Sequence, residues 1–407
     1  MLVKEIYHRV VAAGIIASIT LLVLILLGKH NYVEVLEGID IDTILLLMAM
    51  MTMVSIMARS GIFSYIAIEI IKKTYNKPYL LLVLFGVITG AISAFIDNVT
   101  TVVIVTPIII NIARELRVDP RPLLITIVLM SNIGGTATLI GDPPNILIGT
   151  AADLGFNDFI LNLGPIVVID SILTLLLLKL IYRKYLRSWK ERAKFISTHT
   201  IELDKNLAVK SIISFTITII LFFLEDIIGY PPAIPAVIGA GLLLAMSGRT
   251  ISLHTVLEGI EWSTLVFFIF MFIIIKGIEV LGVIKYIADT ISSLSISVDL
   301  IVIVIVWVSA ILSAFIDNIP FVMAMIPVIK HLNTALNINT PILYWALSLG
   351  GCLGGNGTLI GASANVVVAS ISEKYGYYIS FNSFTKVGLP IMLITVGTAT
   401  LYLLLCY

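Results

Sequence analysis

The sequence predicts an all-α polytopic membrane protein made of two inverted-topology repeats, each with a re-entrant helical hairpin and a broken transmembrane helix. Three observations lead to this prediction. Of the 407 residues, 59% are hydrophobic and only 12% are charged, whereas about 25% of a soluble domain is charged. Residues 93–98 and 313–318 both read SAFIDN, an offset of 220. Each copy places a polar pair within an apolar stretch and a glycine-rich break further along the chain.

Several apolar stretches reach the roughly 20 residues that a helix needs to cross a bilayer. The clearest are 10–27, 160–182, 207–224 and 383–405. The first lacks a small-residue cleavage site, so it is interpreted as a span rather than a signal peptide. The net charge of +0 excludes a basic surface for nucleic acid. The two cysteines, Cys352 and Cys406, form neither a disulfide framework nor a zinc-ligand pattern.

The repeated positions divide the chain. The offset that relates the two SAFIDN strings also pairs Thr138 with Thr358 and Asn145 with Asn365. The predicted parts are a first repeat (1–184), a polar cytoplasmic linker with a connecting transmembrane helix (185–230), and a second repeat (231–407).

The orientation follows from the lysines and arginines, which concentrate in cytoplasmic loops. They place the N-terminus in the cytoplasm and predict that the first repeat begins and ends there. The connecting helix 207–224 then crosses once, so the second repeat starts outside. Helix 233–247 consequently runs opposite to its counterpart 10–27, which defines an inverted repeat. We expect a multi-pass protein of the plasma membrane with an external C-terminus.

Each repeat contains a predicted hairpin, 79–114 and 298–335, with Asp97-Asn98 and Asp317-Asn318 at the two tips. Two full spans satisfy the charge rule equally well. The hairpin is preferred because no hydrophilic connection separates its arms. Broken helices are expected to follow each hairpin, over 122–151 and 341–372.

The tips have two readings. Aspartate and asparagine are favoured N-caps because they accept hydrogen bonds from the first amides of a helix. A charge at membrane depth costs at least a few kcal/mol, however, and serine or asparagine would cap without that cost. Asp97 and Asp317 at matched positions therefore indicate a proton or cation role as well.

The glycine-rich breaks read SNIGGTATLIGDPPN over 131–145 and GGNGTLIGASAN over 354–365. Close helix packing through small residues is one interpretation. Their polar content favours a substrate site, since an unwound helix exposes carbonyls for a cation and amides for an anion. Asp142 has no acidic counterpart because Ala362 occupies the matched position. The two halves are therefore chemically unequal, and we expect one to bind the coupling ion while the other mainly binds substrate.

The candidate substrate or ion-binding residues come from the tips and the breaks. They are Asp97, Asn98, Thr100, Asn132, Gly134, Gly135, Thr136, Thr138, Asp142, Asn145, Asp317, Asn318, Gly355, Asn356, Thr358, Ser363 and Asn365. A Na⁺ site is expected at Asp97, Asn98, Asp317 and Asn318. No transition metal and no cofactor other than Na⁺ or H⁺ as coupling ion is predicted.

Four strings resemble the ion transporter superfamily: AFIDNVTTVVIVTP, NIGGTATLIGDPPN, SAFIDNIPF and GGNGTLIGASAN. The resemblance is to the branch of arsenite efflux permeases and pink-eyed-dilution P proteins, which share a citrate-transporter-like domain, and it covers nearly the whole chain. It implies a scaffold domain that forms a homodimer, a mobile domain with the hairpins and broken helices, and elevator-like alternating access. Dicarboxylate members carry Ser-Asn-Thr motifs, whereas here Ser131-Asn132 is followed by Ile133.

The predicted site contains three aspartates and no Arg, Lys or His, so a carboxylate substrate would meet like charge. We expect a proton- or sodium-coupled secondary transporter, an elevator-type antiporter for Na⁺ or arsenite/antimonite. Sodium-coupled uptake of a di- or tricarboxylate and an anion channel are the alternatives. An intramembrane aspartyl protease is disfavoured because Leu139 replaces the first glycine of a GxGD motif, and no enzyme activity is expected. The predicted partners are the bilayer and a small ion or solute, without nucleic acid.

Overall fold

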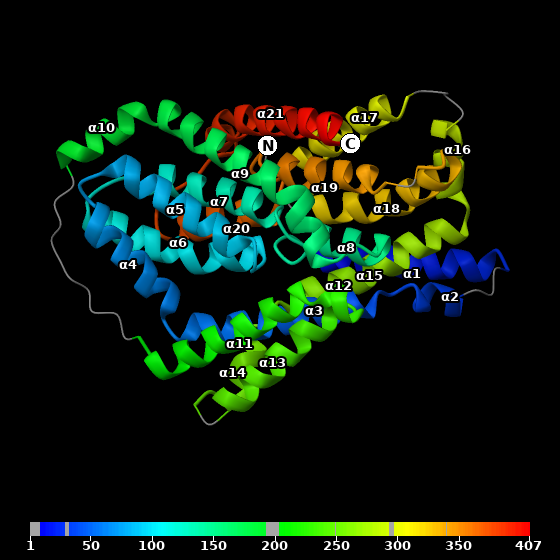
Figure 1. Ribbon diagram of the computed structural model, residues 1–407, viewed down its shortest axis with the longest axis horizontal. Coiled ribbons are helices and arrows are strands. Elements are labelled where there is room, and N and C mark those ends of the chain that lie inside the picture. The colour runs from blue at the N-terminus through cyan, green and yellow to red at the C-terminus, as the bar shows by residue number, and fades with distance from the viewer. Residues whose placement is uncertain (1–8, 29–31, 193–202, 249, 293–296, 339) are drawn as a thin grey trace.

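The computed structural model describes residues 9–28, 32–192, 203–248, 250–292, 297–338 and 340–407. Within these ranges the regular elements are helices, α1 to α21 in chain order (Figure 1). Part of the predicted polar linker, residues 193–202, lies outside the described residues.

The predicted first repeat forms α1 (Arg9–Leu26), α2 (Tyr32–Glu37), α3 (Ile41–Arg59), α4 (Ile62–Thr74), α5 (Pro78–Ser93), α6 (Asn98–Glu115), α7 (Arg121–Gly135), α8 (Pro143–Ala152) and α9 (Phe156–Ile181). The connecting region forms α10 (Arg183–Arg192), α11 (Lys205–Phe223) and α12 (Glu225–Ile228). The predicted second repeat forms α13 (Ala233–Ser247), α14 (Leu253–Glu258), α15 (Trp262–Val280), α16 (Val283–Ser292), α17 (Val298–Phe315), α18 (Asn318–Ala335), α19 (Ile342–Gly354), α20 (Ser363–Lys374) and α21 (Phe381–Cys406).

The protein is an all-helical polytopic membrane protein, as predicted. Eight helices in the described ranges are long and apolar enough to span a bilayer. Their outer faces are apolar and exposed: Leu22 on α1 is 54% exposed and Leu161 on α9 is 71% exposed. Such faces suit lipid rather than water, because a large contiguous apolar surface is not stable in contact with water.

Both predicted helix pairs and both breaks are present. Asp97 joins α5 to α6, and its Oδ1 accepts a hydrogen bond from Thr100 N at 2.9 Å. Asp317 joins α17 to α18 and accepts from Ile319 N at 3.4 Å. The capping interpretation of the two aspartates is therefore correct. The breaks separate α7 from α8 and α19 from α20.

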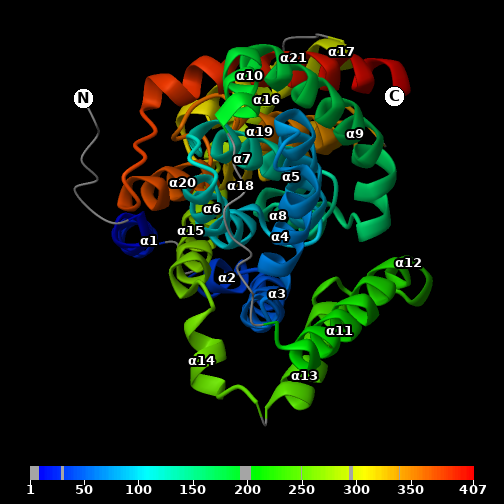
Figure 2. The same cartoon turned by 90° about the vertical axis from the view of Figure 1, so that its left-hand side faces the viewer.

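The helices form two groups. We call α5–α9 with α17–α21 the core unit, and α1, α3, α11, α13 and α15 the frame. Figure 2 shows the frame beneath the core unit. Contacts between the halves of the chain are reciprocal: α6 packs on α20 while α18 packs on α8, and α1 packs on α15 while α13 packs on α3. Each half therefore completes its packing with helices from the other.

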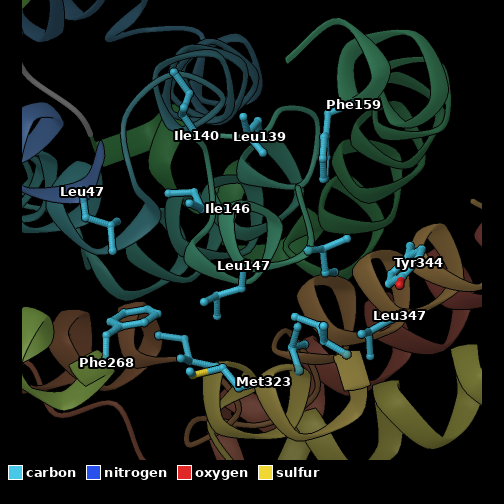
Figure 3. Close-up of a cluster of buried hydrophobic side chains, with 14 of the residues drawn as sticks. Leu47, Leu139, Ile140, Ile146, Leu147, Phe159, Phe268, Met323, Tyr344 and Leu347 are labelled. Carbon is cyan, nitrogen blue, oxygen red and sulfur yellow. The ribbon is translucent and has the colours of Figure 1, made fainter. Parts of the chain in front are cut away.

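An apolar layer joins the two units. Figure 3 shows Leu147 and Met323 of the core unit gathered with Leu47 and Phe268 of the frame, and all four side chains are buried. Contacts of this kind depend on buried area and not on direction. The layer holds the units together without fixing one relative position through hydrogen bonds.

Glycines allow two helix pairs in the core unit to approach closely. A Cβ on Gly134 of α7 would lie 2.1 Å from the carbonyl oxygen of Gly90 on α5, and a Cβ on Gly354 of α19 would lie 2.6 Å from the carbonyl oxygen of Ala310 on α17. The small-residue packing interpretation is therefore correct for these glycines. The same segment packs tightly and breaks its helix.

We predict that Gly134→Ala destabilises the core unit by about 1–3 kcal/mol, since the added methyl group must push α5 and α7 apart. Thermal unfolding of the purified protein in detergent measures this change. The control is Gly164→Ala on α9, where the added Cβ would meet nothing within 4 Å. Equal unfolding temperatures for the two variants would contradict the close approach.

Candidate functional site

The two tips and the first break meet at one small cavity between the core unit and the frame. Among the candidate residues, those that line it are Asp97, Asn98, Asp142, Asn318 and Ser363. Its volume of about 20 Å³ is enough for one species the size of a water molecule. Residues from both halves of the chain thus face one buried point.

Asp142 is the most buried of the aspartates predicted for the site, with 1% of its surface exposed. It occupies the N-cap position of α8, yet its side chain does not cap that helix. Asn318 Nδ2 instead donates to Asp142 Oδ2 at 3.4 Å. The carboxylate of the first break is therefore directed to the tip of the second hairpin and not to its own helix.

Besides the cap on its own helix α18, Asp317 has partners from two other helices. Ser363 Oγ, at the start of α20, donates to Asp317 Oδ2 at 2.6 Å. Arg9 Nη1, at the start of α1, donates to the same oxygen at 3.2 Å and to Ser363 Oγ at 2.7 Å. The frame therefore reaches the second tip through one arginine.

Arg9 corrects the expectation that the site contains no basic residue. Its guanidinium also donates to Thr264 Oγ1 at 3.3 Å and lies 5.5 Å from the ring centre of Phe267, both on α15. In the sequence, Arg9 directly precedes an apolar run, a position typical of a cytoplasmic flanking charge. Because this position has that ordinary explanation, the sequence did not indicate that Arg9 lies at the site.

Glu261 is a second residue that the sequence interpretation missed. It lines the cavity, and its Oε2 accepts from Thr264 Oγ1 at 3.0 Å. The internal repeat contained the signal: Asp40 and Thr43 lie 221 positions before Glu261 and Thr264, and Thr43 Oγ1 donates to Asp40 Oδ2 at 2.7 Å in the same way.

The break asparagines bond to the backbone. Asn145 Nδ2 donates to Thr138 O at 2.9 Å and to Thr136 O at 3.1 Å. Asn365 Nδ2 donates to Gly355 O at 2.8 Å and to Thr358 O at 2.9 Å. The expectation of free carbonyls at the breaks is therefore wrong for these positions, because the amide of each break's own asparagine satisfies them.

Asn132 links the two halves. Its Nδ2 donates to Asn356 Oδ1 at 2.9 Å and to Asn365 Oδ1 at 3.0 Å, while Asn98 Nδ2 donates to its Oδ1 at 3.2 Å. Ser348 Oγ of α19 adds a donor to Asn145 Oδ1 at 2.6 Å. These buried amides form a network behind the cavity.

The remaining candidate residues support the backbone. Thr136 Oγ1 donates to Asn132 O at 2.8 Å, and Thr138 and Thr358 donate to the carbonyls of Ala94 and Ala314. Thr100 contributes its N–H to the cap of Asp97. The glycines among the candidates, Gly134, Gly135 and Gly355, lie buried in the break packing.

The opposite end of the frame helices is hollowed. Arg9 begins α1, a helix about 27 Å long, and Asp40 lies beyond its other end, after α2. Two cavities of about 310 and 540 Å³ open there and share Asp40 and Thr150 in their linings. Glu225 lines the larger one, and burial, with a further contribution from Asp226, raises the pKa of Glu225 to about 7.

Comparisons with known proteins agree with this architecture. Residues 1–350 match the family model described as citrate transporter. A 46 kDa membrane protein of Mycobacterium leprae is 36% identical over 376 residues, covering 91% of this chain and 87% of that protein. The human P protein is 30% identical over 493 residues, covering 100% of this chain and 58% of that protein.

A solved structure is also similar. The YdaH transporter of Alcanivorax borkumensis superposes with a TM-score of 0.65 over 98% of both chains, at 14% sequence identity. That likeness concerns the fold alone. The interlocked helical halves and buried polar centre define a multi-pass membrane transporter. The chain belongs to the citrate transporter family, and its motifs resemble those of the ion transporter superfamily.

We predict that Asn145→Ala destabilises the protein strongly, because each break carbonyl left without a donor costs about 1–3 kcal/mol. Ser348→Ala is the milder variant for comparison. It removes the hydrogen bond that Ser348 donates to Asn145 Oδ1 and leaves intact the bonds from the Asn145 amide to the break carbonyls. Thermal unfolding should rank wild type above Ser348→Ala and Ser348→Ala above Asn145→Ala. A reversed order of the two variants would show that the amide does not support the break.

Proposed function

We propose that this protein is a proton-coupled secondary transporter, an antiporter that exchanges protons for a small cation. Na⁺ is the first candidate substrate. Arsenite, as a neutral solute, is a second substrate that the same oxygen-rich site suits. The observation that supports this most is the convergence of acidic side chains from both halves on one buried cavity. Asp97, Asp142 and Glu261 line it, and Asp317 lies behind Ser363.

The charge balance supports a cation or proton. Four carboxyl groups face a single guanidinium, that of Arg9, whose charge already pairs with Asp317. Asp142 is buried and the other three acids are partly buried. Like charges around one such cavity are unfavourable together, so protons or a cation must neutralise them. Carboxylate and amide oxygens are the ligands that hard cations take in proteins.

The proposed transport cycle moves the core unit against the frame, as in an elevator. Arg9 bridges the frame to Asp317 and Ser363 at one end, while hollows open at the Asp40 end. With the N-terminus in the cytoplasm, this is an outward-open state that Arg9 holds closed on the inside. Movement exposes the tips inward once a cation displaces Arg9 from Asp317.

The reciprocal packing supports inverted repeats. Under that topology the two hairpins are re-entrant and enter from opposite faces, and a two-fold axis lies in the membrane plane. The exposed apolar faces of the frame are where a homodimer would form. The same topology places the C-terminus outside the cell.

Arg9 also supports a second candidate, sodium-coupled uptake of a di- or tricarboxylate. A guanidinium binds a carboxylate through two parallel hydrogen bonds, and the matched family model is described as citrate transporter. In that case Arg9 would leave Asp317 and bind the substrate. The acid-rich lining ranks this candidate second, because it would repel an anion unless sodium filled the site.

Flux in liposomes tests the proposal. An imposed Na⁺ gradient should move protons, which a trapped pH dye reports. Asp142→Asn should reduce that flux at least roughly tenfold, which corresponds to about 1.4 kcal/mol in the activation free energy of transport. Asp299→Asn, an exposed position at the start of α17, is the matched control and should keep wild-type flux.

Labelled citrate and arsenite complete the assay. Suppose that neither a Na⁺ gradient nor an arsenite gradient moves protons, and that the protein takes up citrate unless Arg9 is changed to Gln. That result would overturn the antiporter proposal and select the carboxylate candidate. Ion conductance at rates beyond those of a carrier would select a channel.

A further inference from the structure

A buried acid lies outside the cavity that the hairpin tips form. Asp170 is in the middle of α9, and none of its surface is exposed. It belongs to the inward face of the helix with Val167 and Thr174, whereas Val168 and Ile172 on the other face are more than half exposed. An aspartate within this 26-residue apolar helix is costly unless something compensates its charge.

The polar contact available to Asp170 comes from the last helix of the chain. Thr398 Oγ1 of α21 is hydrogen-bonded to Asp170 Oδ1. Oδ2 has no partner among the described residues, and neither does the hydroxyl of Thr174 one turn along. An ionised carboxylate held by one hydrogen bond in an apolar interior would lose several kcal/mol of solvation without replacement.

Counting protons between the two groups indicates which one donates. The Thr398 hydroxyl has a single proton, yet it also lies 2.9 Å from Thr395 O and 3.1 Å from Ile394 O on its own helix. Threonine hydroxyls in helices commonly donate to such carbonyls. If Thr398 does so, the proton in its bond with Asp170 belongs to the carboxyl group.

Basic residues do not compensate Asp170. The helices packed on α9 are α5, α7, α10, α11, α19 and α21. Their basic residues lie near helix ends: Arg121 opens α7, and Lys205 and Lys210 lie in the first two turns of α11. Lys386 lies in the second turn of α21, about 18 Å along the helix from Thr398. The basic stretch of α10 begins just after α9 ends, and α5 and α19 contain no lysine or arginine. In the part of the chain that the structure describes, Asp170 makes no ion pair.

We propose that Asp170 is a proton-binding site of the core unit, separate from the tip cavity, with the proton held on its carboxyl group at neutral pH and shared with Thr398. The site joins α9 and α21, the last helices of the two halves. A neutral acid explains how the group is tolerated in this packing. The role of this proton in transport rests on the proposed function, in which a proton bound to Asp170 would cross the membrane with the core unit.

Infrared spectroscopy of the purified protein in lipid nanodiscs tests the site without a transport assay, so its failure is distinct from failure of the proposed function. At pH 7 exposed carboxyl groups, with pKa values near 4, are ionised. The wild-type protein should still show the carbonyl band of a protonated carboxylic acid, and Asp170→Asn should lose intensity there. Asp299→Asn, which removes an exposed acid, should leave the band unchanged.

Thr398→Val provides a second measurement if Asp170→Asn does not fold. The valine keeps the shape of threonine without its hydroxyl, so the acid band should remain and shift as its hydrogen bond is lost. A pH 7 spectrum that neither substitution changes would overturn the proposal and show that Asp170 is ionised.

Discussion

Two helices of this protein are interrupted inside its core, and the rest of the structure depends on how the freed backbone groups are satisfied. In a bilayer no water is available for them, so each unpaired carbonyl is costly. Asn145 and Asn365 resolve this by folding their amides back onto the break that precedes them. Thr138 and Thr358 then attach each break to its own hairpin.

This arrangement leaves the site to other side chains. Because asparagine amides occupy these break carbonyls, the polar groups that line the cavity are side chains. They include three carboxylates, Asp97 at the first tip, Asp142 at the first break and Glu261 from the frame. The two halves have matching hairpins and breaks but different side chains at the site. Where the first has Asp142, the second has Ala362 and Ser363, and Arg9 pairs with Asp317 beside them.

Much of this could be predicted from the sequence, because the internal repeat marks both tips and both breaks, and the length of the apolar runs marks the spans. Arg9 could not be, since it meets Asp317 from 308 residues away and looks like an ordinary flanking charge. The amide contacts of Asn145 were equally hidden, because composition shows a polar group without its direction. Asp170 was missed because one acid within a long apolar run does not change the prediction of a span.

We propose that the tips form a site which opens on one side of the molecule at a time, with Arg9 closing one side. The accessibility of introduced cysteines tests this proposal, in a background lacking Cys352 and Cys406. An impermeant thiol reagent should modify Thr150→Cys, in the hollow at the Asp40 end, several-fold faster than Ser363→Cys beside Arg9. Adding Arg9→Gln should accelerate the reaction of Ser363→Cys. Equal rates at the two positions, unchanged by Arg9→Gln, would show that Arg9 does not close one side of the site.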